Sequence, residues 1–302
     1  GREIMSNAFD APGQWLRGNL HLHTTVSDGD LEPQQAIDGY HAQGYDFLAI
    51  TDHNIVVDVD ELDDRGMTLL PGVEIAEVGA ELGQTIHCVG IGPSRQWERL
   101  ENDTAQASIA RLSEICEVCF VAHPSWSSLT FVDILPIEGI IGVEVYNHTC
   151  HQGVGRGKSE VQWDALLARG KKYFGLAVDD AHFHYDDLYG GWIMLRAEEN
   201  TREAIYEALR RGHFYATQGP TIENVQFDGD TVHVECSPVV ECFAVCPLPG
   251  KGWTNWRDEA RRDAHSQFEM TMRAGTDPVR ICVVDQQGRR AWTNPWWRGD
   301  EN

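Results

Sequence analysis

The sequence predicts an α/β fold built on a mainly parallel sheet or a barrel, followed by a smaller all-β part. Three observations support this. Short apolar runs alternate with amphipathic segments over most of the chain, as in strand–helix–strand units. Polar residues directly follow many of these runs, where the carboxyl ends of strands would lie. Finally, 302 residues with 42% hydrophobic side chains suffice for a large core and a smaller one.

In the first part, each apolar run predicts a strand and each amphipathic run predicts a helix. The predicted strands are 16–23, 47–51, 67–75, 85–91, 119–122, 139–146, 173–178 and 192–195. The predicted helices are 33–43, 104–118, 159–168 and 201–211. Pro33 suits a helix start and Gly44 a helix end. Between the strand at 139–146 and the helix at 159–168 we expect a glycine-rich loop.

Beyond Gly219 and Pro220 the pattern changes to short strands separated by turns. The predicted strands are 222–227, 231–236, 241–245, 268–272 and 279–284. Asp-Gly and Gln-Gly pairs at 228–229 and 287–288 are typical of turns, and a weak helical period occurs only near 256–264. We therefore predict two domains, residues 1–219 and 220–302, the second a small sandwich-like β module.

The charge of the chain restricts its partners. With 24 Lys and Arg against 47 Asp and Glu, the net charge is −23. Such a surface repels phosphate backbones and anionic membranes, so we expect neither nucleic acid nor a membrane as a partner, and no oligomeric state is predicted. No apolar run reaches the ~18 residues of a membrane span, and the first residues lack the apolar core of a signal peptide. The eight cysteines lack the spacing of a secreted scaffold, so we expect reduced thiols in a cytoplasmic enzyme.

The residues that carry chemistry begin with His21 and His23 at the end of the first predicted strand. Residues two apart on a strand share a face, so both imidazoles can reach one metal ion. A lone H-x-H is a weak signal, but similar residues follow the later strands. They are Asp28, His53, Glu74, His87, His123, Asp180 and His182. Ionisable groups at buried positions are costly unless they are paired or bind a metal, so the combined set predicts a metal cluster.

These motifs, in this order, resemble the PHP (polymerase and histidinol phosphatase) domain. The resemblance rests on His21-x-His23, Thr51-Asp52-His53, Gly72-Val73-Glu74, His87, Ala122-His123-Pro124 and Asp180-x-His182, and it runs from about Leu16 to about Gly219. The segments 178–182, 190–192 and 291–295 are more similar to the carbaryl-hydrolase-like branch, in which a β module follows the PHP domain. The resemblance implies a distorted (β/α)7 barrel with metals at its C-terminal mouth.

The resemblance also implies up to three metal positions. Their ligands would be His21, His23, Glu74 and Asp180; Glu74, His87 and His123; and Asp28, His53 and His182. Asp28 stands where some family members have a histidine, which leaves the filling of the third position open. Nitrogen and oxygen ligands without a thiolate suit Mn, Fe and Zn alike, so we expect two to three divalent ions of these metals.

The expected activity is hydrolysis of an ester bond. Two metals that share Glu74 could hold a bridging hydroxide, and Glu74, Asp180 and His182 are the expected catalytic residues. The favoured substrate is a small phosphorylated molecule. The alternative is a carboxylic or carbamic ester hydrolysed at the same cluster. A non-catalytic metal-binding module and DNA proofreading are the remaining alternatives.

Residues outside the cluster separate these alternatives. A phosphate needs cationic groups, and Arg156, Lys158 and His148 are the expected substrate contacts, with an ordinary loop role as the other interpretation. An aryl ester would need an apolar wall instead. Asp52 and Asp179 adjoin predicted ligands, where they either orient imidazoles or cap strand ends.

Overall fold

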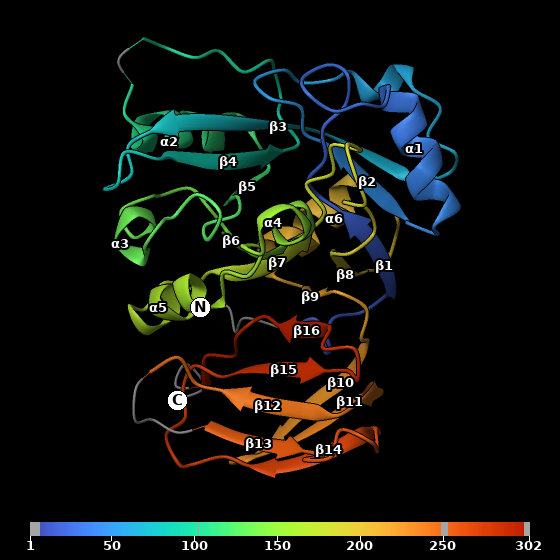
Figure 1. Cartoon of the computed structure of the whole chain (residues 1–302), viewed down its shortest axis with the longest axis vertical. Helices are drawn as coiled ribbons and strands as arrows, with labels where there is room; N and C mark the ends of the chain where they lie inside the picture. Colours follow the sequence, from blue (N-terminus) through green and yellow to red (C-terminus); the bar gives the residue numbers. More distant parts are fainter. Residues whose placement is uncertain (1–6, 102, 249–252, 299–302) are drawn as a thin grey trace.

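The chain folds into the predicted alternation of strands and helices, followed by a region rich in strands (Figure 1). The computed structural model describes residues 7–101, 103–248 and 253–298. Its strands are β1 (Gln14–Asn19), β2 (Phe47–Ile50), β3 (Thr68–Val78), β4 (Thr85–Ile91), β5 (Val118–Val121), β6 (Gly142–Asn147), β7 (Phe174–Val178), β8 (Trp192–Ala197), β9 (Phe214–Thr217), β10 (Ile222–Asp228), β11 (Thr231–Val239), β12 (Glu241–Val245), β13 (Trp253–Arg257), β14 (His265–Thr271), β15 (Arg280–Val284) and β16 (Arg290–Thr293). Its helices are α1 (Pro33–Ala42), η1 (Val59–Glu61), α2 (Ala105–Ile115), α3 (Phe131–Ile134), α4 (His148–Val154), α5 (Glu160–Ala168) and α6 (Arg202–Arg211).

One large mixed sheet organises the molecule. It has 13 strands in the order β13-β12-β15-β16-β9-β8-β1-β2-β3-β4-β5-β6-β7. Strands β1, β2 and β3 pair in parallel, and so do β5, β6 and β7, whereas β4 runs antiparallel to both of its neighbours. The predicted α/β class is therefore confirmed. Parallel strands bring their carboxyl ends to one edge, where the candidate ligands lie.

The chain segments that follow β1 and β7 meet each other. Leu22 and Ala181 form a parallel bridge, the N–H of His23 donates to Ala181 O at 2.8 Å, and the N–H of Asp180 donates to His21 O at 2.9 Å. One apolar cluster also joins side chains from several of these strands, among them Leu16, Phe47, Val89, Phe120, Leu176 and Ile193. The sheet therefore curves around a shared core, whereas complete closure into a (β/α)7 barrel stays a prediction.

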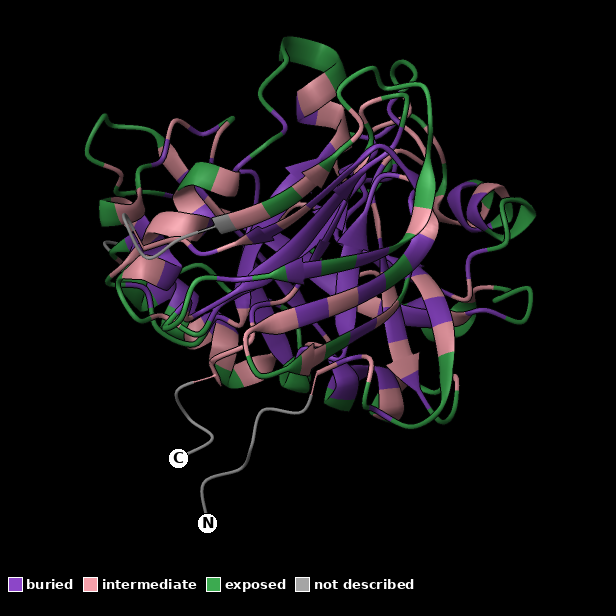
Figure 2. Cartoon of the chain, turned by 90° about the horizontal axis from the view of Figure 1, so that it is seen from below, coloured by how far each residue is buried: buried purple, intermediate pink, exposed green. Residues whose placement is uncertain are grey.

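The C-terminal strands extend the large sheet and add a second one. Strand β16 pairs with β9, so the large sheet runs on into β15, β12 and β13, while β10, β11 and β14 form a separate three-stranded sheet. Side chains of both sheets share an apolar cluster that includes Val225, Val234, Phe268, Ile281 and Val283. Figure 2 shows that burial is concentrated in the strands. A small β region is thus present, but its apolar cluster also includes Tyr215 of β9, and the division after residue 219 stays a prediction.

An ion pair fixes the C-terminal region against the first. Arg280 on β15 is 2% exposed, and its Nε and Nη2 each lie 2.8 Å from a carboxylate oxygen of Asp164 on α5. Arg290 on β16 reaches Glu160 on α5 at 2.8 Å. A buried arginine that lost its partner would be costly, so these pairs specify how the two regions pack.

The structure corrects several sequence-based expectations. The predicted glycine-rich loop after β6 begins with helix α4, because Asn147 Oδ1 accepts from the N–H of Cys150 and caps it. The weak helical period near Trp256 does not correspond to a helix, because Trp256 lies in β13 and its ring packs on Phe268. Strands β9 and β16 were not predicted, and they pair with each other although they lie far apart in the sequence. Within the described ranges, no helix is both long and apolar enough to cross a membrane.

Candidate metal centre

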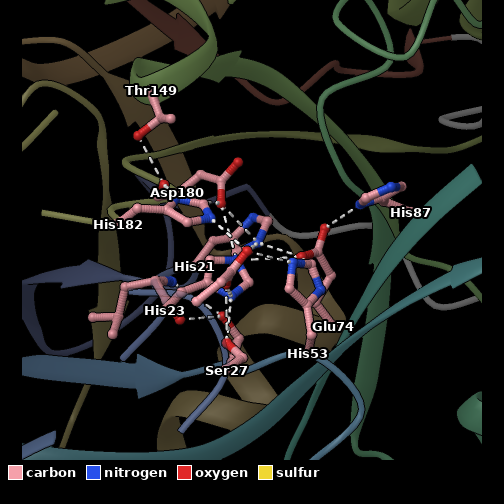
Figure 3. Close-up of polar contacts among 12 residues, drawn as sticks. His21, His23, Ser27, His53, Glu74, His87, Thr149, Asp180 and His182 are labelled. Carbon is pink, nitrogen blue, oxygen red and sulfur yellow. Dashed lines mark hydrogen bonds and ion pairs between the residues drawn. The ribbon is translucent and has the colours of Figure 1, made fainter. Parts of the chain in front are cut away.

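The candidate ligands converge at the carboxyl edge of the sheet, although they come from distant parts of the sequence. Figure 3 shows seven of them converging: His21, His23, His53, Glu74, His87, Asp180 and His182. His21 and His23 follow β1, His53 follows β2, Glu74 and His87 lie within β3 and β4, His123 follows β5, and Asp180 and His182 follow β7. Three groups bring their ligand atoms within 4.8 Å of one another: His21, His23 and Asp180; Glu74, His87 and His123; and His23, Asp28, His53 and His182.

The first group is almost fully buried. The Nε2 atoms of His21 and His23 lie 3.2 Å apart, and they are 3.2 and 3.1 Å from Asp180 Oδ1. Neither imidazole is exposed, and Asp180 is 5% exposed. Two ring nitrogens this close repel each other unless a proton or a cation lies between them. The arrangement suits a shared cation.

Glu74 joins the groups. Its Oε1 is 2.9 Å from His87 Nδ1 and 3.3 Å from His123 Nε2. Its Oε2 is 3.4 Å from His21 Nε2, 3.2 Å from His23 Nε2 and 3.1 Å from His53 Nδ1. Each oxygen therefore faces a different set of imidazoles, which is how a carboxylate that bridges two cations would be placed.

The third group is more open. Asp28 Oδ2 lies 3.6 Å from Nε2 of both His53 and His182, and Asp28 Oδ1 lies 3.6 Å from His23 Nδ1. The side chain of Asp28 is 52% exposed, against 27% for His53 and 18% for His182. His182 Nδ1 lies 2.8 Å from the carbonyl oxygen of Asp180, which only accepts, so Nδ1 carries the proton and Nε2 keeps its lone pair.

The donor set fits a metal cluster on two further observations. Asp180 Oδ1 is buried without a hydrogen bond of good geometry, which is costly for a carboxylate unless it has a ligand. His123 and Asp180 also have positive φ angles of 29° and 57°. Non-glycine residues seldom adopt such angles, and they are concentrated at functional sites. The residues thus fit divalent ions held by nitrogen and oxygen, and no thiolate takes part.

The electrostatics of the metal-free protein lead to the same conclusion. Burial lowers the pKa of His23, but the carboxylates of Asp180 and Glu74 outweigh it and raise the pKa to about 9. The pKa of His21 is likewise raised despite burial, chiefly by Asp180 and Glu74. Burial would raise the pKa of Glu74, yet His21 and His123 hold it well below its usual range. Without a metal, the buried carboxylates therefore recruit protons onto the imidazoles, in the place that cations would take.

Asp52 and Asp179 stabilise loops instead of orienting imidazoles. Asp52 accepts from the N–H and Oγ1 of Thr24 and from the N–H and Oγ of Ser27, which holds the turn before Asp28. Asp179 accepts from Tyr40 Oη and from the N–H groups of 189–191. Burial raises the pKa of Asp179 to about 6, although these hydrogen bonds oppose that shift. Of the two interpretations of these aspartates, the strand-end one agrees with the contacts.

Glu144 is the buried carboxylate that sequence reasoning missed. It lies on β6, is 0% exposed, and its Oε1 is 2.7 Å from His21 Nδ1. A carboxylate is the proton acceptor here, so His21 Nδ1 carries the hydrogen and Nε2 is free to bind a metal. The available signal was a single charged residue inside an otherwise apolar strand.

A pocket of about 320 Å³ opens over the ligands. Apart from candidate ligands, its wall contains the side chains of Trp126, Thr149, Val154, His184 and Tyr185. Trp126, Val154 and Tyr185 are 44%, 60% and 47% exposed, so an apolar rim faces solvent beside the ligands. No lysine or arginine lines the pocket within the part of the chain that the structure describes. Sequence reasoning missed this rim, because Trp126 and Tyr185 lie in separate loops and Val154 ends helix α4.

The expected substrate contacts lie outside the pocket lining. Arg156 is exposed, and its Nη1 donates to Ser128 Oγ at 3.1 Å. The backbone of Lys158 bridges that of Tyr146, and its charge interacts with Arg290 and Glu160. His148 Nδ1 pairs with Tyr146 Oη at 2.9 Å. The structure therefore brings the predicted metal ligands together but does not bring these three side chains to them.

Comparisons with known proteins find similarities to segments of this chain. Residues 154–238 match a family described as a protein of unknown function (DUF3604). A 5'-3' exoribonuclease from Haemophilus influenzae is 38% identical over 77 residues, which are 24% of this chain and 27% of that protein. A 3',5'-nucleoside bisphosphate phosphatase from Chromobacterium violaceum is 36% identical over 78 residues, again 24% of this chain and 27% of that protein. The chain thus matches about a quarter of the length of these curated relatives.

The fold has a solved counterpart over its full length. A two-domain protein from Bacteroides vulgatus, described as containing a predicted PHP-like metal-dependent phosphoesterase, superposes with a TM-score of 0.52 at 15% identity. The match covers 98% of this chain and 100% of the other. The chain therefore has the fold of a PHP-like two-domain protein. The sequence matches to the exoribonuclease and the bisphosphate phosphatase are short, so membership in the PHP superfamily and in its carbaryl-hydrolase-like branch stays a prediction.

Proposed function

We propose that this protein is a metal-dependent phosphoesterase that hydrolyses a small phosphorylated molecule. The observation that carries the proposal is the position of Glu74, whose two oxygens face imidazoles of all three ligand groups. Purely structural metal sites are closed, whereas this one lies under an open pocket. The short sequence matches to a bisphosphate phosphatase and to an exoribonuclease support phosphoester chemistry.

The residues have distinct roles in this proposal. Bound divalent cations would polarise a phosphoryl oxygen and lower the pKa of a water molecule. Glu74 would hold two cations at a fixed separation, and Asp180 would fix the innermost one with His21 and His23. His182 and Asp28 would hold a cation on the solvent side of the pocket, next to the substrate. Mn, Fe and Zn all suit these ligands.

Hydrolysis of a carboxylic or carbamic ester is the second candidate. One observation favours it: the described pocket lining has an apolar rim and no lysine or arginine. Bound cations would nevertheless attract a phosphate, because six charges on three dications exceed the three charges of Asp28, Glu74 and Asp180. The two candidates therefore differ in what surrounds the reacting group and not in the ligands.

A parallel substrate screen separates the candidates. The zinc- or manganese-loaded protein would be assayed with 4-nitrophenyl phosphate, bis(4-nitrophenyl) phosphate, a 3',5'-nucleoside bisphosphate, a short RNA and 1-naphthyl acetate. A chelator-treated sample is the control. Chelator-sensitive turnover of a phosphoester supports the proposal. Turnover of the naphthyl ester alone would transfer the assignment to the second candidate, and turnover of RNA would overturn the charge-based exclusion of nucleic acid.

A further inference from the structure

Glu144 contacts two candidate ligands and a residue that contacts a third. Its Oε1 accepts a hydrogen bond from His21 Nδ1 at 2.7 Å. Its Oε2 accepts hydrogen bonds from the backbone N–H of His123 at 2.7 Å and from Asn147 Nδ2 at 2.9 Å. Asn147 Nδ2 in turn donates to Asp180 Oδ2 at 3.0 Å. A single carboxylate thus connects the ends of β1, β5 and β7.

The local backbone explains why a charged side chain lies here. The neighbours Val143 and Val145 are 0% exposed and pack in the apolar cluster behind the sheet, so Glu144 points to the other face, toward the ligands. The register of β6 against β7 shifts between Glu144 and Tyr146. Such irregularities commonly redirect side chains beside active sites. The position of Glu144 is therefore built into the strand.

We propose that Glu144 is a positioning residue that holds His21 in its metal-binding tautomer and fixes the first two metal positions relative to each other. This inference rests on the proposed metal centre but not on the identity of the substrate. All three partners of Glu144 are N–H donors, and both of its oxygens are used. A negatively charged acceptor at the Nδ1 side also makes Nε2 a better donor to a cation.

Substitution by glutamine would remove this function with little change in shape. The amide has one acceptor oxygen and one donor NH₂ group. If the NH₂ group faces His123 and Asn147, it meets two other donors. If it faces His21, then Nδ1 must accept and the hydrogen moves to Nε2, where the metal would bind. Either orientation disturbs one metal position.

The test is the zinc affinity of three proteins, measured by competition with a chromophoric chelator. They are the wild type, Glu144→Gln and Glu160→Gln. Glu160 lies on α5 and pairs with Arg290 outside the centre, so it is a matched control for the same chemical change. We expect Glu144→Gln to bind zinc about 10- to 100-fold more weakly and the control to bind like the wild type. An affinity of Glu144→Gln within threefold of the control would overturn the proposal.

Tautomer state distinguishes positioning from general damage. In the zinc-loaded wild type, long-range ¹H–¹⁵N spectra should show His21 protonated at Nδ1, with its signals assigned by their loss in His21→Asn. Glu144→Gln should change that pattern, and weaker zinc binding with an unchanged His21 tautomer would refute the mechanism. If circular dichroism shows that Glu144→Gln is unfolded, Glu144→Asp is used for the test instead. Aspartate keeps the negative charge but places it one methylene farther from His21 and His123. That variant should bind zinc with intermediate affinity, and wild-type affinity would count against the proposal.

The outcomes also separate this inference from the proposed function. Zinc affinity that depends on Glu144 in a protein without phosphoesterase activity would support the positioning role and remove the proposed function. Phosphoesterase activity with zinc affinity independent of Glu144 would do the reverse.

Discussion

The Nε2 atoms of His21 and His23 lie 3.2 Å apart, and both residues come just after Asn19, the last residue of β1. The extended geometry continues past the strand because Leu22 between them bridges Ala181. The same bridge brings Asp180 beside both rings. One backbone contact between distant segments therefore assembles the innermost ligand group.

Replacing Glu74 with glutamine should remove both metal binding and hydrolysis. A neutral amide cannot bridge two cations as a carboxylate can, and its NH₂ group would face imidazole nitrogens that need a cation. We expect at least one metal equivalent to be lost and kcat/KM to fall by more than about a hundredfold, beyond what loss of one charged hydrogen bond would give. Metal analysis beside a Glu160→Gln control checks this. A variant with full metal content and activity would show that Glu74 is not a ligand.

Arg156 tests the sequence-based substrate contacts. Because Arg156 bonds to Ser128 and does not line the pocket, we expect Arg156→Gln to leave kcat/KM for a phosphoester nearly unchanged. If the side chain instead moves to bind phosphate, its loss should cost ~1.5–3 kcal/mol, or about ten- to a hundredfold in kcat/KM. Steady-state kinetics on a phosphoester and on a neutral ester distinguish the two cases, since only the phosphoester should respond to the charge.

Trp126 tests the apolar rim. Its ring centroid lies 4.9 Å from that of His123, and the residue is 44% exposed and lines the pocket. We expect Trp126→Ala to raise KM for an aryl phosphate by about three- to tenfold, the value of one aromatic contact, without loss of metal. An alkyl phosphate of the same charge is the control. Equal effects on both substrates would mean that the tryptophan acts by supporting His123.

Metal affinity should weaken as the pH falls below about 9. In the metal-free protein the pKa of His23 is raised to about 9, so below that pH a metal must displace a proton. Each displaced proton weakens binding by up to about tenfold per pH unit. Calorimetry in buffers of different ionisation enthalpy should detect proton release at pH 7.5. Zinc affinity that does not change between pH 6.5 and 8.5 would contradict the raised pKa.

The raised pKa of His23 also makes the stability of the metal-free protein depend on pH. The pKa of His23 is raised on folding, so its ion pairs stabilise the metal-free protein fully below the unfolded value of 6.5, and the stabilisation is lost as the pH rises through about 9. Denaturant unfolding of the chelated protein should therefore show this contribution disappearing between those two values.

The sequence indicated most of the candidate ligands because they interrupt or follow an apolar run, whereas Asp28 lies in a turn. Glu74 and His87 lie in strands of mostly apolar residues, and that contrast is visible in the sequence alone. The alternation of strands and helices predicted that the carboxyl ends of the strands, and the polar residues that follow them, would lie at one edge of the sheet. The barrel expectation was less secure, because the antiparallel β4 and the continuation through β16 depend on pairing between distant segments.

The features that the sequence did not predict depend on tertiary contacts. Glu144 is a charged residue in a mostly apolar strand, but its partner His21 lies 123 positions away, so the sequence does not show that the two meet. Helix α4 was not predicted because Gly153, Gly155 and Gly157 suggest a loop, whereas the cap from Asn147 starts a helix. Arg156 and Lys158 come just after that helix, and neither lines the pocket. Local patterns therefore indicated the candidate ligands, and the assembled fold was needed to show what surrounds them.

Metal stoichiometry tests the central claim most directly. Protein expressed with excess metal, freed of loosely bound ions by gel filtration, would be assayed by elemental analysis and for phosphoesterase activity, before and after chelation. We predict two to three equivalents of Mn, Fe or Zn per chain, with activity lost on chelation and restored by the metal. Less than one equivalent in a folded protein, or phosphoesterase activity that survives complete removal of the metal, would contradict the account.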